Sequence, residues 1–336
     1  MTDSTKPREQ VKRAELLEQE GQDQAALDIW EKLARAHPHV LFSKRVGLLA
    51  QKMGRLQHAR EAYESAVRLD PADSSAYSGL AEVAAARKDY RESIDFYTKA
   101  IEIEPRASAL TLLAFAQRQD GQLSAARQSL QRALELDPGF DEAWLQLGLC
   151  YIEDDLSKAE QLARKAVDLD PEYSDNVRVL GVIVGLQSRH AESVKLLRRA
   201  VELAPDKGST QTYLGNELRL SGELKAAEKC FREAICLRTR GAAPLIGLAN
   251  IRWAQGEAAA ARTFFERALD RDPTSFVAHM EFGLFFRDQG KVREAKQHWI
   301  QALQSEPEFA KVKLRQRVER LLVEMDPKGD LKGRVI

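Results

Sequence analysis

The stretch GEAAAARTFFERALDRDP, residues 256–273, carries the marks that decide the fold. Gly256 opens it and a proline closes it, and both residue types interrupt regular structure, so one helix is expected between them. Ala261 and Ala268 stand seven residues apart and therefore lie on one face of that helix. Phe265 lies between them on the same face. A face with two small residues and one large residue favours close packing against a neighbouring helix.

The same marks recur along nearly the whole chain at intervals of 33 or 34 residues. The closing prolines are Pro38, Pro71, Pro105, Pro138, Pro171, Pro205, Pro273 and Pro307, and Thr239 stands where one more is expected. A fixed period of this length is typical of a stack of repeated units. We divide the chain into nine units, at about 7–39, 40–73, 74–106, 107–140, 141–173, 174–207, 208–241, 242–275 and 276–309.

Each unit is expected to form two helices that meet at a turn residue such as Gly256. The second helix carries one large residue between its two small ones: Trp30, Tyr63, Tyr97, Leu130, Leu197, Phe231, Phe265 or Trp299. Unit five has Ala163 at this place. A pair of helices of this size cannot bury its apolar face alone, so the units must stack on one another.

The pattern resembles the tetratricopeptide repeat. The resemblance is carried by AWLQLGLCY (143–151), LGNELRLSGELKAAEKCFREAI (214–235) and the stretch quoted first. It implies an all-α, right-handed superhelical solenoid whose first helices line a concave groove. The departures are serines for alanines in units three and six, a residue lost from the turn of unit five, and the missing proline of unit seven.

The two ends of the chain lie outside the repeats. The amphipathic stretch EFAKVKLRQRVERLLVEM (308–325) predicts a helix, at about 310–325, that caps the last unit. Residues 1–6 are expected to be a disordered N-terminus, and residues 326–336 a flexible tail.

Composition and motifs argue against several classes of function. Lys and Arg together number 51, as do Asp and Glu, so no net charge attracts nucleic acid or an anionic membrane. The first residues lack the apolar core of a signal peptide, and no apolar run is long enough to span a membrane. Three cysteines without a CxxC spacing suggest reduced thiols in the cytoplasm. We found no phosphate loop, dinucleotide motif or zinc-protease motif, so we expect no catalytic residue, cofactor or metal ion.

Polar and aromatic side chains mark the first helices of units seven to nine. The candidate peptide-binding residues are Tyr213, Asn216, Arg219, Asn250, Trp253 and Arg287. An amide offers a donor and an acceptor together, which suits the backbone of an extended peptide. The family resemblance implies this role for Asn216 and Asn250 alone. The alternative is that both asparagines only pack between helices.

Apolar side chains mark the first helices of units four to six. The candidate apolar groove consists of Leu112, Phe115, Leu145, Leu149, Ile152 and Val182. Such a surface suits an amphipathic helix of a partner or of a second copy of this chain. The alternative is that neighbouring first helices cover these side chains.

The sequence therefore predicts a non-enzymatic scaffold or adaptor, chaperone-like in character, that binds a peptide or helix of a partner protein in its groove. An assembly or regulatory subunit of an enzyme or secretion complex is the alternative. RNA binding is disfavoured by the charge balance. Self-association remains open, and no membrane partner is expected.

Overall fold

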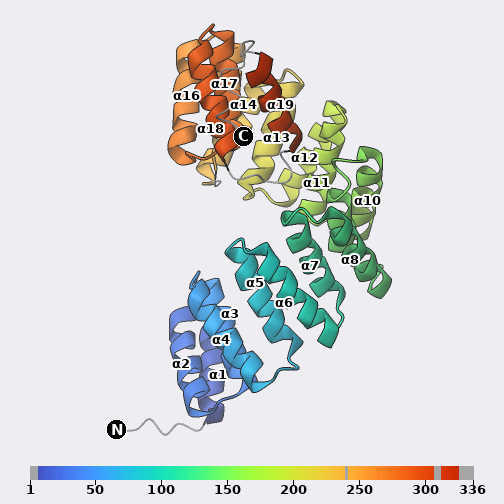
Figure 1. Ribbon diagram of the computed structural model, residues 1–336, viewed down its shortest axis with the longest axis vertical. Coiled ribbons are helices and arrows are strands. Elements are labelled where there is room, and N and C mark those ends of the chain that lie inside the picture. The colour runs from blue at the N-terminus through green and yellow to red at the C-terminus, as the bar shows by residue number, and fades with distance from the viewer. Residues whose placement is uncertain (1–6, 239–240, 306–311, 325–336) are drawn as a thin grey trace. The chain divides into compact units, whose positions relative to one another are not determined.

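A computed structural model describes residues 7–238, 241–305 and 312–324, and these residues form helices joined by short turns (Figure 1). Within these ranges the chain has no β-strand. On either side of Cys150, consecutive helices pack against each other, both within a pair and between one pair and the next. The predicted all-α solenoid of paired helices is therefore confirmed.

The helices fall into two compact units, one ending at Cys150 and the other beginning at Tyr151. The first contains α1 (Pro7–Gln19), α2 (Asp23–Ala36), α3 (Val40–Lys52), α4 (Leu56–Leu69), α5 (Ser74–Ala86), α6 (Tyr90–Ile103), α7 (Ala107–Gln119), α8 (Leu123–Leu136) and α9 (Asp141–Leu149). The second contains α10 (Leu156–Leu169), α11 (Ser174–Leu186), α12 (His190–Leu203), α13 (Gly208–Leu220), α14 (Leu224–Cys236), α15 (Ala243–Ala254), α16 (Ala258–Arg271), α17 (Phe276–Asp288), α18 (Val292–Gln304) and α19 (Val312–Glu324).

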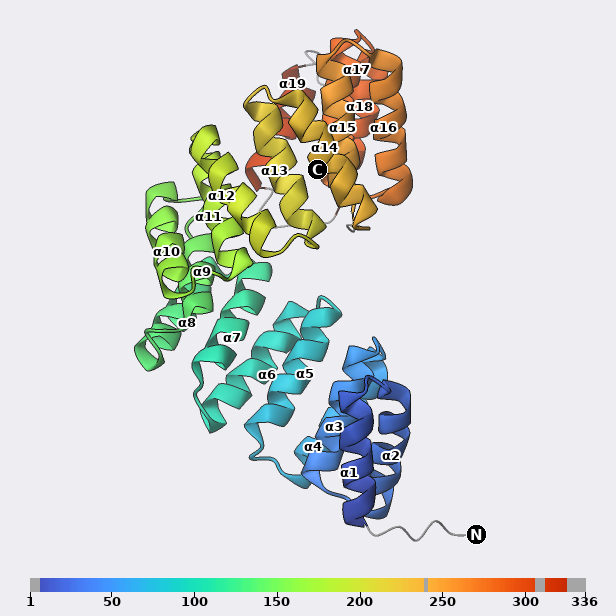
Figure 2. The ribbon, with the colours of Figure 1, turned by 180° about the vertical axis from the view of Figure 1, so that it is seen from behind.

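The core of each compact unit is built from the face that the sequence marks. Even-numbered helices are the second helices of the repeats, as Figure 2 allows the reader to follow from α2 to α18. Their small residues and the large residue between them are buried in every repeat, and Trp30, Phe231, Phe265 and Trp299 are fully enclosed. Ala163 is also fully buried on α10. The burial of such large side chains is the dominant favourable contribution to folding.

Phe231 shows how closely the helices approach. Its ring lies between Gly215 on α13 and Gly247 on α15, and an added Cβ would come within 2.7 Å and 2.3 Å of the ring, respectively. Both distances are shorter than any ordinary carbon–carbon contact. The two glycines therefore let one aromatic ring fill the space between successive first helices.

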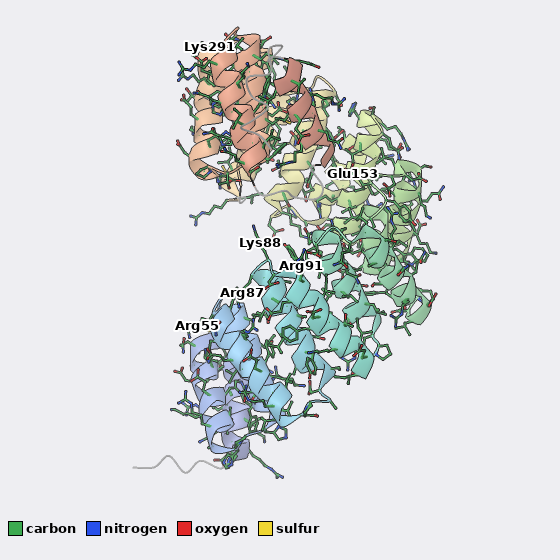
Figure 3. All side chains as sticks on the ribbon, in the orientation of Figure 1. Arg55, Arg87, Lys88, Arg91, Glu153 and Lys291 are labelled. Atoms are coloured by element: carbon green, nitrogen blue, oxygen red, sulfur yellow. The ribbon has the colours of Figure 1, made fainter. Side chains whose placement is uncertain are left out.

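The turns between paired helices use a left-handed backbone conformation. Glycine occupies most of these turns, for example Gly256 with a φ of 78°. Lys88 and Ser188 adopt the same conformation, with φ values of 64° and 62°, at a cost that glycine avoids. Figure 3 shows Arg55 and Lys88 at successive turns of the first compact unit.

Unit five departs from the regular pattern in its first helix. Helix α9 has 9 residues, whereas most other first helices have 13, and it ends before the turn. The Arg127 guanidinium of α8 donates from Nε at 3.2 Å and from Nη2 at 2.6 Å to the carbonyl oxygen of Cys150. These bonds satisfy a carbonyl that the shortened helix leaves without its usual partner.

The predicted cap corresponds in position to α19, which packs against α18. Arg315 donates from Nη2 to the carbonyl oxygen of Leu303 at 2.6 Å, and Val318 is fully buried in the core that α17 and α18 form. The predicted N-terminus 1–6, the place of the missing proline at Thr239 and the tail 326–336 lie outside the described residues.

A pair of histidines lies in the core between α17 and α18. His279 places Nε2 3.0 Å from the carbonyl oxygen of Pro273, and its Nδ1 lies 3.0 Å from Nδ1 of His298. A carbonyl oxygen only accepts, so the His279 proton is on Nε2 and His298 donates to its Nδ1. Burial, with a contribution from His279, lowers the pKa of His298 to about 4. His298 is therefore neutral at pH 7.

The contact of Phe231 with Gly247 generates a first prediction. The change Gly247→Ala should lower the free energy of unfolding by about 1–3 kcal/mol, because overpacking outweighs the better helix propensity of alanine. Urea unfolding followed by circular dichroism measures this loss. Adding Phe231→Leu to Gly247→Ala should restore part of it, since the smaller side chain makes room for the methyl group. If the two substitutions lower the free energy of unfolding additively, the contact between Phe231 and Gly247 is contradicted.

The histidine pair generates a second prediction. The folded-state pKa of His298 lies below its ordinary value of 6.5, so the unfolded chain binds the proton more tightly. This contribution to stability is complete above about pH 6.5 and is lost as the pH falls toward about 4. Allowing for partial exposure, we expect the free energy of unfolding to fall by about 1–2 kcal/mol more than that of His298→Gln over this pH range. Thermal unfolding of both proteins from pH 7 to 4 tests this, and parallel profiles would refute it.

Candidate functional site

The candidate peptide-binding residues lie on three successive first helices of the second compact unit. Tyr213, Asn216 and Arg219 are on α13, Asn250 and Trp253 are on α15, and Arg287 is on α17. We call these six residues, together with Glu281 of α17, the first-helix surface. The structure brings some of them into one cluster and leaves others apart.

Glu281 is the centre of that cluster. Its carboxylate accepts a hydrogen bond from the side-chain amide of Asn250, and it interacts electrostatically with Arg219 and with Arg317 of α19. Burial raises the pKa of Glu281, while the two arginines and the amide oppose this rise. Side chains from four helices thus converge on a single acid.

The cluster leaves two buried polar atoms without a partner among the described residues. They are Nε of Arg219, which is a donor, and Oδ1 of Asn250, which is an acceptor. An unpaired buried polar atom costs about 1–3 kcal/mol.

Asn216 has the same repeat position as Asn250 but a different environment. Asn250 meets Glu281, which lies 31 residues further along the chain; the residue 31 positions after Asn216 is Gly247. Gly247 has no side chain, and the ring of Phe231 leaves no room for one. The half-buried amide of Asn216 therefore makes no side-chain hydrogen bond within the described ranges.

The remaining polar candidates differ in the contacts that their side chains make. Trp253 donates from Nε1 to Asp288 at 2.9 Å, which holds its indole in place. The guanidinium of Arg178 lies 5.6 Å from the ring centre of Tyr213, a side chain that is 40% exposed. Arg287 is exposed, and its side chain forms no ion pair within the residues that the structure describes.

The apolar candidates divide between the two compact units, with Ile152 and Val182 in the second. In the first, Leu145 is only 5% exposed and belongs to the core, whereas Leu112 is 36% exposed. Phe115 and Leu149 are half-buried, and the Arg118 guanidinium lies 5.6 Å from the ring centre of Phe115. In the second, Ile152 and Val182 are half-buried.

Two residues of the cluster were missed from the sequence. The repeat pattern places Glu281 on the groove side of its helix, so a charged residue at this position could have marked it as a site residue. Arg317 lies in the predicted cap, and nothing in the sequence connects it with an acid so far away along the chain.

Two searches of the described residues gave negative findings. No group of three or more His, Cys, Asp and Glu side chains there is placed to hold a metal ion. None of the helices in these ranges combines the length and apolar character needed to cross a membrane.

The cluster generates a third prediction. When the pKa of a carboxyl group is raised above its ordinary value of 4.5 by folding, its ionisation destabilises the folded state. The stability of Glu281→Gln relative to the unchanged protein should therefore improve as the pH rises from 4.5 to 7. Urea unfolding at several pH values measures this difference. Glu135→Gln, at an exposed position of α8, should show no such trend, and a relative stability of Glu281→Gln that falls as the pH rises would refute the raised pKa.

Comparison with known proteins supports the same architecture. The tetratricopeptide repeat profile matches residues 46–108, 111–174 and 212–276, which together make up more than half of the chain. The CTR9 homolog of Arabidopsis thaliana is 31% identical over 105 residues, which cover 31% of this chain and only 10% of that protein.

Two solved structures show the likeness of fold. A tetratricopeptide repeat protein from Parabacteroides merdae has a TM-score of 0.59 and 17% identity, covering 79% of this chain and 98% of its own. Yeast Tom70 has a TM-score of 0.50 and 12% identity, covering 98% of this chain and 97% of its own. The repeat register, the paired helices and the matching profile agree, and the chain belongs to the tetratricopeptide repeat family.

Proposed function

We propose that this protein is a non-enzymatic scaffold or adaptor of the cytoplasm that holds an extended segment of a partner protein on its first-helix surface. Membership of the tetratricopeptide repeat family supports a role in protein–protein interaction. The three free cysteines support a reducing compartment.

The amide of Asn216 carries the proposal. It is half-buried on a regular helix, and no described residue bonds to it, so its donor and acceptor are both open to a ligand. Tyr213 lies one helical turn away on the same face and is exposed. A peptide backbone can bond to the amide while one of its side chains packs on the tyrosine ring.

The neighbouring residues define what else the peptide should carry. Arg287 is a cation without an acidic partner among the described residues, so it favours an acidic side chain or a terminal carboxylate. Trp253 is fixed by Asp288 and offers rigid contact area at low entropic cost. Asn250 already binds Glu281, and its Oδ1 is buried, so Asn216 is the amide that we assign to the ligand.

The fourth prediction tests this surface with peptides. An array of 15-residue peptides from proteins that copurify with the chain identifies a ligand, and fluorescence anisotropy then gives its affinity for each variant. Asn216→Ala should weaken binding about five- to tenfold, the effect of one hydrogen bond of about 1–1.5 kcal/mol. Arg287→Ala should weaken it at low salt and less at high salt, because an exposed ion pair is screened.

The matched control is Arg293→Ala, which removes an exposed arginine from the second helix α18 and should leave the affinity unchanged. Equal affinities for Asn216→Ala, Arg287→Ala and the unchanged protein would exclude the first-helix surface as the binding site. Capture of RNA in place of peptides, with a steep loss at high salt, would favour the RNA-binding alternative.

A further inference from the structure

Two cations and one acid lie at the start of α11, beside the first-helix surface. Asp175 and Arg178 are on α11, and Lys207 directly precedes α13, so all three belong to the second compact unit. Oδ2 of Asp175 accepts from Nζ of Lys207 at 2.7 Å, and its Oδ1 accepts from Nε of Arg178 at 3.1 Å. Both cations therefore share a single carboxylate.

The shared acid leaves a surplus of positive charge. Burial raises the pKa of Asp175, but hydrogen bonds from Lys207 and Arg178, together with their charges, outweigh burial and hold this pKa below its ordinary value. The acid is therefore ionised at pH 7, and it offsets only one of the two cations. Lys207 also donates to Oγ of Ser174 at 3.2 Å and lies over the ring of Tyr173, so it is the more fully engaged cation.

Arg178 keeps part of its guanidinium open. Only Nε bonds to Asp175, and the two Nη groups have no hydrogen-bond partner among the residues that the structure describes. They are not among the buried atoms that lack a partner, as Nε of Arg219 is, so they reach solvent. The guanidinium also lies 5.6 Å from the ring centre of Tyr213. Two contacts thus fix the arginine while its outer edge remains available to a ligand.

The side chain of Tyr213 completes a small subsite on the next first helix. It is 40% exposed, and its hydroxyl forms no hydrogen bond within the described ranges. Asn216 lies one helical turn away on the same face. A guanidinium edge and a hydroxyl both donate, which matches a carboxylate because its oxygens only accept. We call this arrangement the Arg178–Tyr213 subsite.

The repeat supplies an internal comparison. Lys44 is the fifth residue of α3, as Arg178 is of α11, and other units carry an uncharged residue there, such as Thr212. The ammonium of Lys44 has Asp73 to itself at 2.6 Å, and Gly79 stands where the subsite has Tyr213. The fold therefore does not require a cation at this position, and only Arg178 combines a shared acid with an exposed ring.

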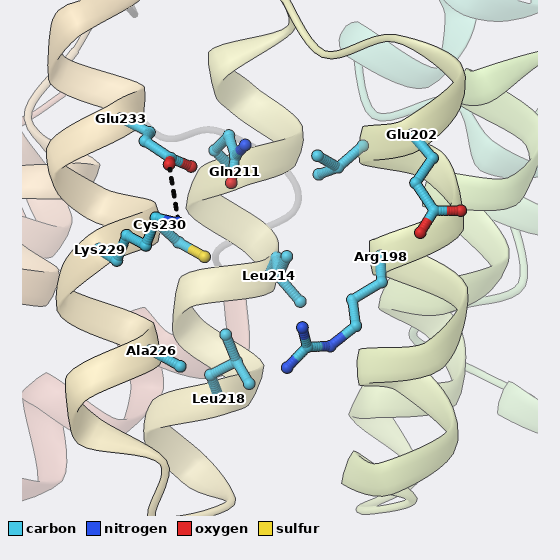
Figure 4. A pocket seen from close by; sticks show the side chains of 10 residues that line it. Arg198, Glu202, Gln211, Leu214, Leu218, Ala226, Lys229, Cys230 and Glu233 are labelled. Carbon is cyan, nitrogen blue, oxygen red and sulfur yellow. Dashed lines mark ion pairs between the residues drawn. The ribbon is translucent and has the colours of Figure 1, made fainter.

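An arginine on the other side of α13 has a different environment. Figure 4 shows Arg198 of α12 over Leu214 and Leu218, the apolar floor of a pocket of about 250 Å³ between α12 and α14 that Gln211 also lines. Nη2 of Arg198 lies 3.7 Å from the carboxylate of Glu223. That arginine has an acid that no second cation shares in the described part of the chain.

We propose that the Arg178–Tyr213 subsite binds an acidic side chain, aspartate or glutamate, of the partner segment whose backbone Asn216 holds. The carboxylate accepts from the Nη groups of Arg178 and from the hydroxyl of Tyr213, and its aliphatic stem lies on the tyrosine ring. This inference rests on the proposed function and deepens it, because it extends the contact to α11 and selects segments with an acid close to the peptide bond at Asn216.

Random peptides test the subsite without a known partner. A phage-displayed library of random dodecapeptides is selected on the full chain and, in parallel, on Arg178→Met, Lys44→Met and Asn216→Ala. The unchanged chain should enrich peptides with Asp or Glu at one fixed position. Arg178→Met keeps most of the aliphatic stem and removes the guanidinium, so it should still enrich peptides but without this preference. Lys44→Met is the matched control and should retain the preference.

A double-mutant cycle then measures the contact. The most enriched peptide is synthesised with its acid and with the corresponding amide, and fluorescence anisotropy gives both dissociation constants for each protein. The unchanged chain should bind the amide form about five- to tenfold more weakly, the loss expected for a partly exposed charge-assisted hydrogen bond. For Arg178→Met the two forms should differ by less than about twofold. Arg178→Lys should keep part of the difference, because the charge remains and the forked donor is lost.

The outcomes separate this inference from the proposed function. An acid preference that persists in Arg178→Met, with enrichment lost in Asn216→Ala, would overturn the subsite alone. A preference that is lost equally in Lys44→Met would reflect overall charge and would also overturn it. Failure of the unchanged chain to enrich any peptide would overturn both proposals. Displacement of the peptide by an oligouridylate at equal concentration would assign Arg178 to a phosphate and reject the acidic side chain.

Circular dichroism checks that each variant is folded. If Arg178→Met is not, Tyr213→Phe decides, because it removes the hydroxyl and keeps the ring. This variant should weaken binding of the acidic peptide about two- to threefold and leave the amide form unchanged. Equal effects on the two peptides would contradict a contact between the hydroxyl and the acid.

Discussion

The large side chain that every second helix except α10 carries, enclosed by small residues of the helices around it, is the contact on which the rest of the structure depends. Phe231 is the clearest case, because its ring touches the backbone of two successive first helices at Gly215 and Gly247. The ring therefore joins one repeat to the next as well as closing its own pair. Burial of a ring of this size favours folding by a few kcal/mol, and it is obtained only when the neighbouring repeat is in place.

This packing has a consequence for the surface of the repeats. Since the small core positions recur in every repeat, similar pockets form at α2–α4 and at α12–α14, where two second helices flank a first helix. The linings of the two pockets differ: Ser43 and Val46 stand in one where Gln211 and Leu214 stand in the other.

The two asparagines of the first-helix surface show how packing assigns different chemistry to equivalent positions. Asn250 meets an acid from the next first helix, and the pair is supported by arginines from α13 and α19. For Asn216 the position equivalent to Glu281 is Gly247, which has no room for a side chain because Phe231 fills that space. A requirement of the core thus leaves one amide open at the surface. The site that we propose for a peptide is a by-product of how an aromatic ring is accommodated.

The sequence by itself determined the helices, their pairing and the faces that are buried. The reason is that residues such as Ala261, Phe265 and Ala268 recur with a fixed period, and periodicity along a helix translates directly into one side of it. Only the tertiary structure decided which polar residues meet. Glu281 and Arg317 are far apart in the chain and share no motif, and their proximity depends on the stacking of α13, α15, α17 and α19. The shortened α9, capped by Arg127, and the buried amide of Gln211 were likewise decided by contacts between helices, which a repeat pattern does not encode.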